Sequence, residues 1–473
     1  MSIKDDERLS GAMQENVLTL LCFDSERSKL VRHAVQPNIF ESAVYKEIAT
    51  QAINFLDQYG TSIGEHLPDT LEHILQGTDA RKARSYKSAL EGLFHMKDQL
   101  HGEYVLQQLN KFVRQQTMKS SIVRAVELIE DGKVDDAEVT LQEGLSKQIV
   151  SFDGGTQLSD TSKSLKFLDN RDHNGFFLGI EELDRADCMA RRKELLLFLA
   201  PRGRGKSWFM THVAKMGAIQ RACVVIFTLE MSEEAYSERL VQAMFSISKR
   251  DNVVNIPILS KDGDGVLTHI DHEELQRHAL TDPDIKPYLA SRIRREFKRK
   301  PPLIVKEFPT GTLTISMMKA YLDGLERFQK IKPDIIIVDY PDLMDIDSKN
   351  LRVDTGKVYA ALRGIAVDRQ CAMVVASQGN RESETARTVT GSMAAEDISK
   401  IAISDTVLTY SQTPGEKRMG LARLLVEKNR RDADKFQVLI GQSYQMGQFH
   451  LDSVRMGGDY WEMVEPRGRG EED

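Results

Sequence analysis

The segment that decides the fold is Leu195-Leu-Leu-Phe-Leu-Ala-Pro-Arg-Gly-Arg-Gly-Lys-Ser207. It opens with a continuous apolar run, which is typical of a buried strand in a largely parallel sheet. A glycine-rich turn follows, and a helical pattern begins at Lys206 and Ser207. The segment therefore predicts a strand, a tight turn and a helix, an arrangement in which the helix N-terminus can bind phosphate.

Residues 200–207 match the phosphate-loop pattern G-x-x-x-x-G-K-[ST], except that Ala200 replaces the first glycine. Small residues let backbone N–H groups close around phosphate oxygens. We expect Lys206 to reach the β- and γ-phosphates and the Ser207 hydroxyl to complete a Mg²⁺ shell. The structural alternative, a glycine-rich turn with no ligand, is less well supported between a strand and a helix. The predicted nucleotide-binding residues are Ala200, Pro201, Arg202, Gly203, Arg204, Gly205, Lys206, Ser207 and Trp208.

Two other strand ends supply carboxylates. Asp339 follows the β-branched run 335–338, at the carboxyl end where the ligands of parallel sheets collect. We expect Asp339 to hold Mg²⁺ directly or through water, the alternative being a turn-initiating role before Tyr340. The strand at 223–229 ends at Glu230, which could accept a proton from the attacking water. Motif and spacing alone leave open whether Glu230 is this base or an acid at the start of a helix.

Beyond the phosphate loop, short β-rich runs alternate with helical patterns from about residue 176. This alternation indicates an α/β domain built on a largely parallel sheet. The first 150 residues are helical almost throughout, with apolar stripes such as Tyr45 to Leu56 and Ile122 to Ile129, the second followed by Gly132. Each stripe, taken alone, indicates a small helical domain with its own core. The expected strands are 195–200, 223–229, 303–305, 335–338, 373–377, 406–410 and 421–426, and the expected helices lie near 207–220, 232–247, 314–329 and 356–370.

A polar, glycine-bearing stretch at 151–175 is typical of a linker. The end of the chain, from Pro466, has no apolar content and is expected to be disordered. We therefore expect a helical N-terminal domain at 1–104 and a helical and polar linker region at 105–175. The α/β domain that carries the phosphate loop is expected at 176–460 and a disordered tail at 461–473.

Composition excludes several classes of protein. The 473 residues carry a net charge of −7, so any binding of nucleic acid must be local. The four cysteines form no CxxC pair, which argues against a zinc site or a disulfide framework and fits a reducing compartment. The longest apolar runs are far shorter than the roughly 20 residues of a membrane helix, and the first residues lack the apolar core of a signal peptide. We expect a soluble intracellular protein that has no membrane partner.

Four motifs together resemble those of the DnaB-type replicative helicases, the bacteriophage-type members above all. They are the phosphate loop, Phe227-Thr-Leu-Glu-Met-Ser232, Asp334–Met344 and Ser377-Gln-Gly-Asn-Arg381. The likeness extends to the N-terminal half: Glu15–Asp24 and 39–45 are similar to that family's helical N-terminal domain, and 105–150 to its helical linker region.

The resemblance implies a RecA-like ATPase domain that binds ATP and Mg²⁺ and assembles into a ring of six. It implies ATP-driven travel, 5′ to 3′, along single-stranded DNA, and unwinding of the duplex at a replication fork. Primase and a helicase loader are the implied protein partners. The implied location is the cytoplasm, or the host cytoplasm if the protein is viral.

The resemblance also assigns residue roles. Lys206, Ser207, Glu230 and Asp339 keep the roles given above. Gln378 matches the glutamine that senses the γ-phosphate and couples it to the DNA loop; its structural alternative is a polar strand end. The segment Lys428-Asn-Arg430 looks like the K-x-R element that reaches the ATP of a neighbouring subunit, where an arginine stabilises charge on the transferred phosphoryl group. Arg431 follows directly, so Arg430 and Arg431 both remain candidates, and a solvated charge run is the alternative.

The loop 379–392 is long, and long loops inside compact domains are usually functional. The family's channel loop lies here, so Arg381 and Arg387 are the first candidates for contacts with DNA phosphates, followed by Lys400. Such contacts would be ionic and independent of sequence. A second basic cluster, Arg292–Lys300, is compatible with nucleic-acid binding and equally with a charged helix face.

Three classes of function remain. The first is a hexameric DNA helicase, and the second is a RecA-like ATPase of recombination or regulation that does not unwind DNA. The third is an interaction protein that binds ATP only for assembly. The helical N-terminal half favours the first class over the second. A fused primase is disfavoured, because no cysteine-paired zinc motif precedes the motor.

Overall fold

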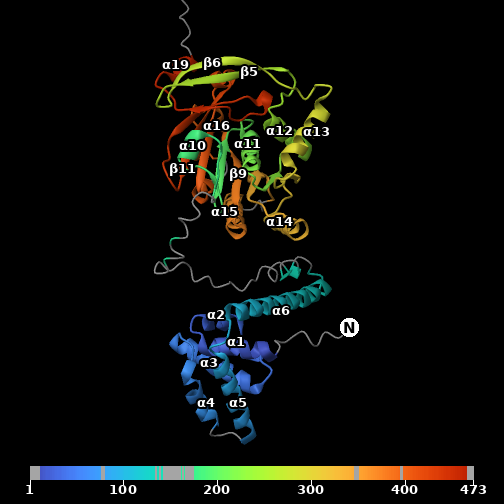
Figure 1. Ribbon diagram of the computed structural model, residues 1–473, viewed down its shortest axis with the longest axis vertical. Helices are drawn as coiled ribbons and strands as arrows, with labels where there is room; N and C mark the ends of the chain where they lie inside the picture. Colours follow the sequence, from blue (N-terminus) through green and yellow to red (C-terminus); the bar gives the residue numbers. More distant parts are fainter. Residues whose placement is uncertain are drawn as a thin grey trace, which may run out of the picture. The chain divides into compact units, whose positions relative to one another are not determined.

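The computed structural model describes residues 11–75, 80–133, 136–137, 140–141, 161, 165, 175–345, 351–394 and 398–465. The chain divides into two compact units at residues 164 and 165, and each is described by itself (Figure 1). Most of the predicted linker at 151–175, and the end of the predicted tail at 466–473, lie outside the described residues.

The N-terminal unit is helical, and its core forms where the helices turn one apolar face inward. Within α3, Ile48, Ala49, Ala52, Ile53 and Leu56 are all buried, which confirms the first predicted stripe. Ser42 begins α3 by accepting a hydrogen bond from the Val44 N–H, and the left-handed Gly60 ends it. The helices are α1 (Gly11–Phe23), α2 (Arg27–Ala34), α3 (Ala43–Tyr59), α4 (Leu67–Leu75), α5 (Ala80–Met96) and α6 (Gly102–Glu130).

The long helix α6 departs from the prediction in two ways. Val105 and Leu109 are buried in the N-terminal core, so the expected boundary between 104 and 105 falls inside this helix. The second predicted stripe is not core: Ile122 is 48% exposed and Ile129 is 53% exposed. Its spacing places these side chains on one helical face, of which Ala125 is buried, whereas Ile122, Val126 and Ile129 stay exposed among the residues that the structure describes. Gly132, with φ +76°, follows the helix as predicted.

The C-terminal unit contains a nine-stranded sheet in the order β13-β12-β11-β10-β3-β9-β8-β4-β7. The pairs from β10 across to β7 are parallel, whereas β11, β12 and β13 pair antiparallel. This arrangement confirms the predicted α/β domain with a largely parallel sheet. The strands are β3 (Leu195–Ala200), β4 (Val224–Thr228), β7 (Leu303–Glu307), β8 (Ile335–Asp339), β9 (Ala372–Gln378), β10 (Thr406–Ser411), β11 (Leu421–Asn429), β12 (Gln437–Gly441) and β13 (Ser453–Val454).

Helices cover both faces of this sheet, which explains why its central strands are continuously apolar. In β3, Leu196 and Phe198 belong to one core and Leu195 and Leu197 to the other, because successive side chains point to opposite faces. The first core packs against α11 (Lys206–Ile219) and α12 (Glu233–Phe245), and the second against α14 (Ile315–Gln329) and α15 (Leu351–Arg369). The remaining helices include α10 (Glu181–Arg185), α13 (Ile285–Phe297), α16 (Arg381–Thr385), α17 (Ser399–Ile403), α18 (Pro414–Arg418) and α19 (Tyr460–Val464).

Two features beside the main sheet were not predicted. An antiparallel hairpin, β5 (Val253–Lys261) and β6 (Leu267–Gln276), lies beside α19 (Figure 1). Helix α19 extends into the predicted disordered tail: Tyr460 and Val464 are buried in a small core with Leu259 and Leu267. The expectation of a tail from 461 is therefore wrong for 461–465, because the hairpin supplies the apolar surface that these residues cover. Within the described part of the chain, the structure contains no helix with the length and apolar character needed to cross a bilayer.

Candidate nucleotide site

The turn between β3 and α11 has the geometry of a phosphate loop. Gly203 and Gly205 have φ values of +67° and +72°, which side-chain-bearing residues rarely adopt. A Cβ atom on Gly205 would also lie 3.2 Å from the Tyr410 ring. The glycines are therefore required by the turn itself, and Lys206 and Ser207 begin α11 immediately after it.

The ends of four parallel strands bring the predicted residues to one edge of the sheet. Ala200 of β3 pairs with Gln378 of β9, and Thr228 of β4 pairs with Asp339 of β8. Glu230 follows two residues after Thr228. We call this edge the carboxyl edge of the sheet. It carries the phosphate loop, both predicted carboxylates and the predicted sensor.

Lys206 lies at the centre of this group. Its Nζ donates to Gln378 Oε1 at 3.3 Å and lies 4.7 Å from the centroid of the Tyr340 ring. Burial lowers the pKa of Lys206, whereas the charges of Glu230 and Asp339 act in the opposite direction. The lysine is therefore a desolvated cation at the phosphate loop, where its attraction for phosphate oxygens would be stronger than in water.

Asp339 is a fully buried carboxylate, and neither of its oxygens accepts a geometrically good hydrogen bond from the described residues. Burial raises its pKa to about 6, and the neighbouring Ser207 hydroxyl and Lys206 cation oppose that rise. A buried carboxylate with unused acceptor atoms beside a hydroxyl suits a hard divalent cation. Asp339 and Ser207 therefore fit a Mg²⁺ site, in which Mg²⁺ would neutralise phosphate charge.

The acids after β4 have different surroundings. Glu230 is exposed, and its backbone lies next to β8 because the Leu229 N–H donates to the Asp339 carbonyl at 3.0 Å. Glu233 instead holds α12 to β7, since its Oε1 accepts from the Glu307 N–H at 3.0 Å. Ser232 caps α12 by accepting from the Ala235 N–H at 3.2 Å. The structure thus gives Glu233 a structural role and leaves Glu230 as the acid beside Lys206 and Asp339.

The other phosphate-loop residues differ in surroundings. Pro201 is buried, whereas Arg202 is exposed. Arg204 is turned toward the β10 end of the sheet, where its Nη1 donates to the Gln412 carbonyl at 2.8 Å. Trp208 stacks on Tyr444 with 5.1 Å between ring centroids, and the Arg239 guanidinium lies 4.9 Å from the Trp208 ring. A nucleotide contact by Arg204 or Trp208 stays a prediction.

The Lys428-Asn-Arg430 element lies at the opposite edge. Asn429, the last residue of β11, pairs with Thr406, the first residue of β10. Thr406 also pairs with Leu196, near the start of β3. At 3.3 Å per residue, roughly 13 Å of β3 separates this level from Ala200. We call this side of the sheet the amino edge.

Contacts within the chain hold the cations of the amino edge. Lys428 Nζ donates to the carbonyl oxygens of Ile401, Ala402 and Ser404 at 3.0, 2.8 and 2.7 Å. Arg430 Nη1 donates to Asp405 Oδ1 at 2.8 Å, and its side chain is 47% exposed. Arg431 pairs with Glu194, the residue before β3, so the choice between Arg430 and Arg431 remains open.

The predicted DNA-binding loop is more ordered than expected, because it contains α16 and is bonded to β10. The Val389 N–H donates to Ser411 Oγ at 2.9 Å. Arg381, the first residue of α16, is exposed. Arg387 lies with its guanidinium 3.5 Å from the centroid of the Trp461 ring and is 55% exposed. DNA contacts by Arg381 and Arg387 stay predictions.

The prediction that Lys400 contacts DNA is wrong for this structure, because its side chain is fully buried. Its Nζ donates to Ser377 Oγ at 2.7 Å and lies 3.2 Å from Asp342 Oδ1.

Sequence reasoning missed Asp342, which has no motif signal other than its place three residues after Asp339. It also missed the Tyr340 ring over Lys206, although that residue adjoins the metal-binding candidate.

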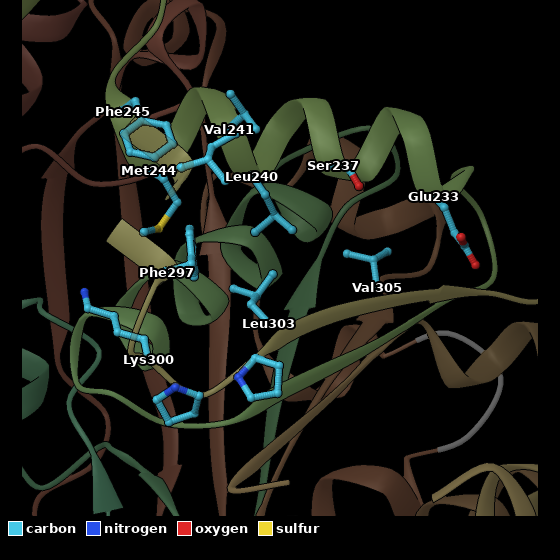
Figure 2. Close-up of a pocket in the computed structure, with 13 residues that line it drawn as sticks. Glu233, Ser237, Leu240, Val241, Met244, Phe245, Phe297, Lys300, Leu303 and Val305 are labelled. Carbon is cyan, nitrogen blue, oxygen red and sulfur yellow. The ribbon is translucent and has the colours of Figure 1, made fainter. Parts of the chain in front are cut away.

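A separate apolar pocket of about 590 Å³ lies between α12, α13 and β7. Figure 2 shows Leu240, Met244 and Phe245 of α12 on one side of it, with Phe297 and Leu303 opposite. None of the predicted nucleotide-binding residues lines it, and its few polar groups could not neutralise a triphosphate. Part of the Arg292–Lys300 cluster packs here: Phe297 lines the pocket, and Lys300 pairs with Glu296.

Comparison with known proteins identifies the family. Residues 175–431, more than half of the chain, match the DnaB-like helicase C-terminal domain. The chain belongs to this family. Two curated relatives are named replicative DNA helicase DnaB. The one from Synechocystis sp. is 22% identical over 249 residues, covering 52% of this chain and 25% of the relative. The one from Nostoc sp. is 24% identical over 211 residues, covering 44% of this chain and 21% of the relative.

The alignments thus span only about a quarter of the length of these curated DnaB relatives. A solved structure of a DnaB-like replicative helicase, described with its interactions with primase, resembles this chain over a longer range. The alignment with that structure covers 95% of this chain and 100% of the other chain, with a TM-score of 0.53 and 15% sequence identity. That likeness extends the DnaB-like fold to the helical N-terminal unit.

Proposed function

We propose that the protein is an ATP-driven replicative DNA helicase. It forms a ring of six copies, travels 5′ to 3′ on single-stranded DNA and unwinds the duplex at a replication fork in the cytoplasm, which is the host cytoplasm if the protein is viral. Primase and a helicase loader are its proposed partners. The membership of residues 175–431 in the DnaB-like family supports this proposal.

The observation that carries the proposal is the division of charged residues between the two edges of the sheet. Lys206, Asp339, Gln378 and Glu230 gather at the carboxyl edge, whereas Arg430 lies at the amino edge with a half-exposed side chain. This separation within one chain, together with the exposure of Arg430, supports a role for Arg430 at a phosphate bound by another copy. Head-to-tail contacts of this kind produce a closed ring when the rotation between copies closes.

In this proposal, each residue of the carboxyl edge has a distinct task. Lys206 and the backbone of the phosphate loop bind the phosphates, and Ser207 and Asp339 hold Mg²⁺, which screens phosphate charge. Glu230 orients the attacking water and accepts its proton. Gln378, in contact with Lys206, reports the presence of the terminal phosphate to the loop that follows it. Arg430 of an adjacent copy stabilises the charge that develops during transfer.

A forked-DNA unwinding assay with ATP, run beside a mass measurement of the nucleotide-bound assembly, tests the proposal. We expect strand separation that depends on ATP and a mass of six copies. ATP hydrolysis stimulated by DNA without strand separation would instead support the recombination or regulatory ATPase. A chain that stays a monomer with every nucleotide would contradict the shared site.

A further inference from the structure

Three residues from distant parts of the chain form a buried polar cluster beneath the carboxyl edge. Lys400 Nζ donates to Ser377 Oγ at 2.7 Å and lies 3.2 and 3.3 Å from the two carboxylate oxygens of Asp342. Asp342 also accepts from the Ser377 hydroxyl at 3.1 Å and from the Tyr359 hydroxyl at 2.9 Å. The Lys400 side chain is fully buried, and that of Asp342 is 7% exposed.

The cluster adjoins the nucleotide site along the chain on two sides. Asp342 lies three residues after Asp339, in the short helical turn Pro341–Leu343. Ser377 directly precedes Gln378, whose side chain contacts Lys206. Lys400 therefore binds the two strand ends that carry the predicted metal ligand and the predicted sensor.

Lys400 itself belongs to α17, which connects these strand ends with the amino edge. Lys428 bonds to the carbonyl oxygens of Ile401 and Ala402 within α17 and of Ser404 just after it. Arg430 Nη2 lies 3.3 Å from the Ala402 carbonyl oxygen, and its Nη1 pairs with Asp405. The same helix of five residues thus carries both the Lys400 contacts and carbonyl groups that hold Lys428 and Arg430.

We propose that Lys400 is a positioning residue. Its contacts with Asp342 and Ser377 hold α17 and, through α17, hold Lys428 and Arg430 in a fixed relation to the chain's own nucleotide site. Replacing a buried ion pair with neutral groups often costs little stability. Stability alone therefore does not account for this pair, whereas a role in holding the geometry does. The inference rests on the proposed function, in which Arg430 acts on the site of a neighbouring copy. Loss of the pair should leave a subunit with an intact site and a misplaced Arg430.

The test variant is Lys400→Met combined with Asp342→Asn, because removing one charge alone would leave the other buried and unpaired. The control is Arg369→Met with Asp323→Asn, which removes the more exposed ion pair between α15 and α14 and also the contact of Arg369 with Glu326. We expect nucleotide affinity and KM for ATP to stay near wild type in the test variant, while kcat falls roughly tenfold. The control should keep its kcat. An unchanged kcat in the test variant would overturn the inference.

Mixing subunits separates a positioning role from a general structural one. Lys206→Ala subunits have a disabled site and a correctly placed Arg430. The Lys400→Met/Asp342→Asn subunits have an intact site and a misplaced Arg430. We expect mixed assemblies to hydrolyse ATP faster than either parent, because an intact site next to a Lys206→Ala subunit meets an intact Arg430. If the variant does not fold, judged by thermal unfolding, Ser377→Ala replaces it in the same mixture.

A second mixture, in which Arg430→Ala subunits take the place of the Lys400→Met/Asp342→Asn subunits beside Lys206→Ala, identifies which proposal has failed. Recovery with Arg430→Ala but not with the Lys400 variant would show that the positioning role is wrong while the shared site stands. No recovery in either mixture would contradict the shared site, and with it the proposed function.

Discussion

At the carboxyl edge of the sheet, Lys206 is buried, contacts Gln378 and has Glu230 and Asp339 as charged neighbours. At the amino edge, Arg430 is half exposed and bonded to Asp405, whereas Lys428 binds carbonyl groups at the end of α17. The parallel strands bring one group together, and the reversal of β11 relative to β10 sends the other group to the far edge. In the proposed function, these two groups are the two halves of a site that adjacent copies share, and one chain carries them at opposite edges of its sheet.

The largest expected effect follows from removing the cation at the carboxyl edge. Lys206→Ala should abolish ATP turnover, because it removes the buried ammonium group that contacts Gln378 and lies beside Asp339 at the phosphate loop. Steady-state ATP hydrolysis measures this, with the surface variant Lys249→Ala as the control. Hydrolysis that persists in the Lys206 variant would show that the phosphate site lies elsewhere.

The amino edge should behave differently. Arg430→Ala should preserve nucleotide binding yet lower kcat by about 10³-fold, as loss of a trans arginine does. Arg431→Ala is the matched comparison, because that side chain pairs with Glu194 instead. Equilibrium binding of a fluorescent nucleotide and ATP hydrolysis should be measured together. If only the Arg431 variant loses activity, the trans arginine is Arg431.

Glu230→Gln sharpens the comparison within the carboxyl edge. We expect nucleotide binding to persist and kcat to fall by about 10²–10⁴-fold, the range typical of a lost general base. Glu233→Gln is the control, because Glu233 accepts a hydrogen bond from the Glu307 N–H and an amide oxygen can do the same. Equal losses in both variants would argue against Glu230 as the base.

Asp339→Asn should change stability in a way that depends on pH. Burial raises the pKa of Asp339 from 3.8 to about 6. The folded protein therefore loses stability as the pH rises through that interval, because the buried carboxyl group must ionise. Without nucleotide or Mg²⁺, the variant should raise the free energy of unfolding by about 3 kcal/mol at pH 7. The gain should shrink as pH falls below about 6. Chemical denaturation at pH 5 and pH 7 measures it, and a gain independent of pH would contradict the assignment.

The smallest expected effect is on DNA binding. Arg381→Ala should weaken binding to single-stranded DNA modestly for every sequence and reduce the salt slope by about 0.7 per lost phosphate contact. The double variant Lys400→Met/Asp342→Asn should leave that slope unchanged, because Lys400 is buried. Binding isotherms at several salt concentrations distinguish the two. An unchanged slope in the Arg381 variant would remove Arg381 from the interface.

The sequence predicted the parallel strands and the helices between them well, because continuous apolar runs such as 195–200 have few alternative structures. It also placed Lys206, Asp339 and Gln378 at one edge, since parallel strands end together. It did not predict the β5–β6 hairpin, in which most β6 side chains are exposed and no apolar alternation marks the strand. Lys400 looked like a surface cation because its partner, Asp342, lies 58 residues away in the chain.

One measurement tests the central claim most directly, namely the specific ATPase activity across a dilution series with the assembly mass followed at each concentration. If adjacent copies share the site, activity per chain should fall together with the ring as the protein is diluted. Activity per chain that stays constant when only single chains remain would contradict the account.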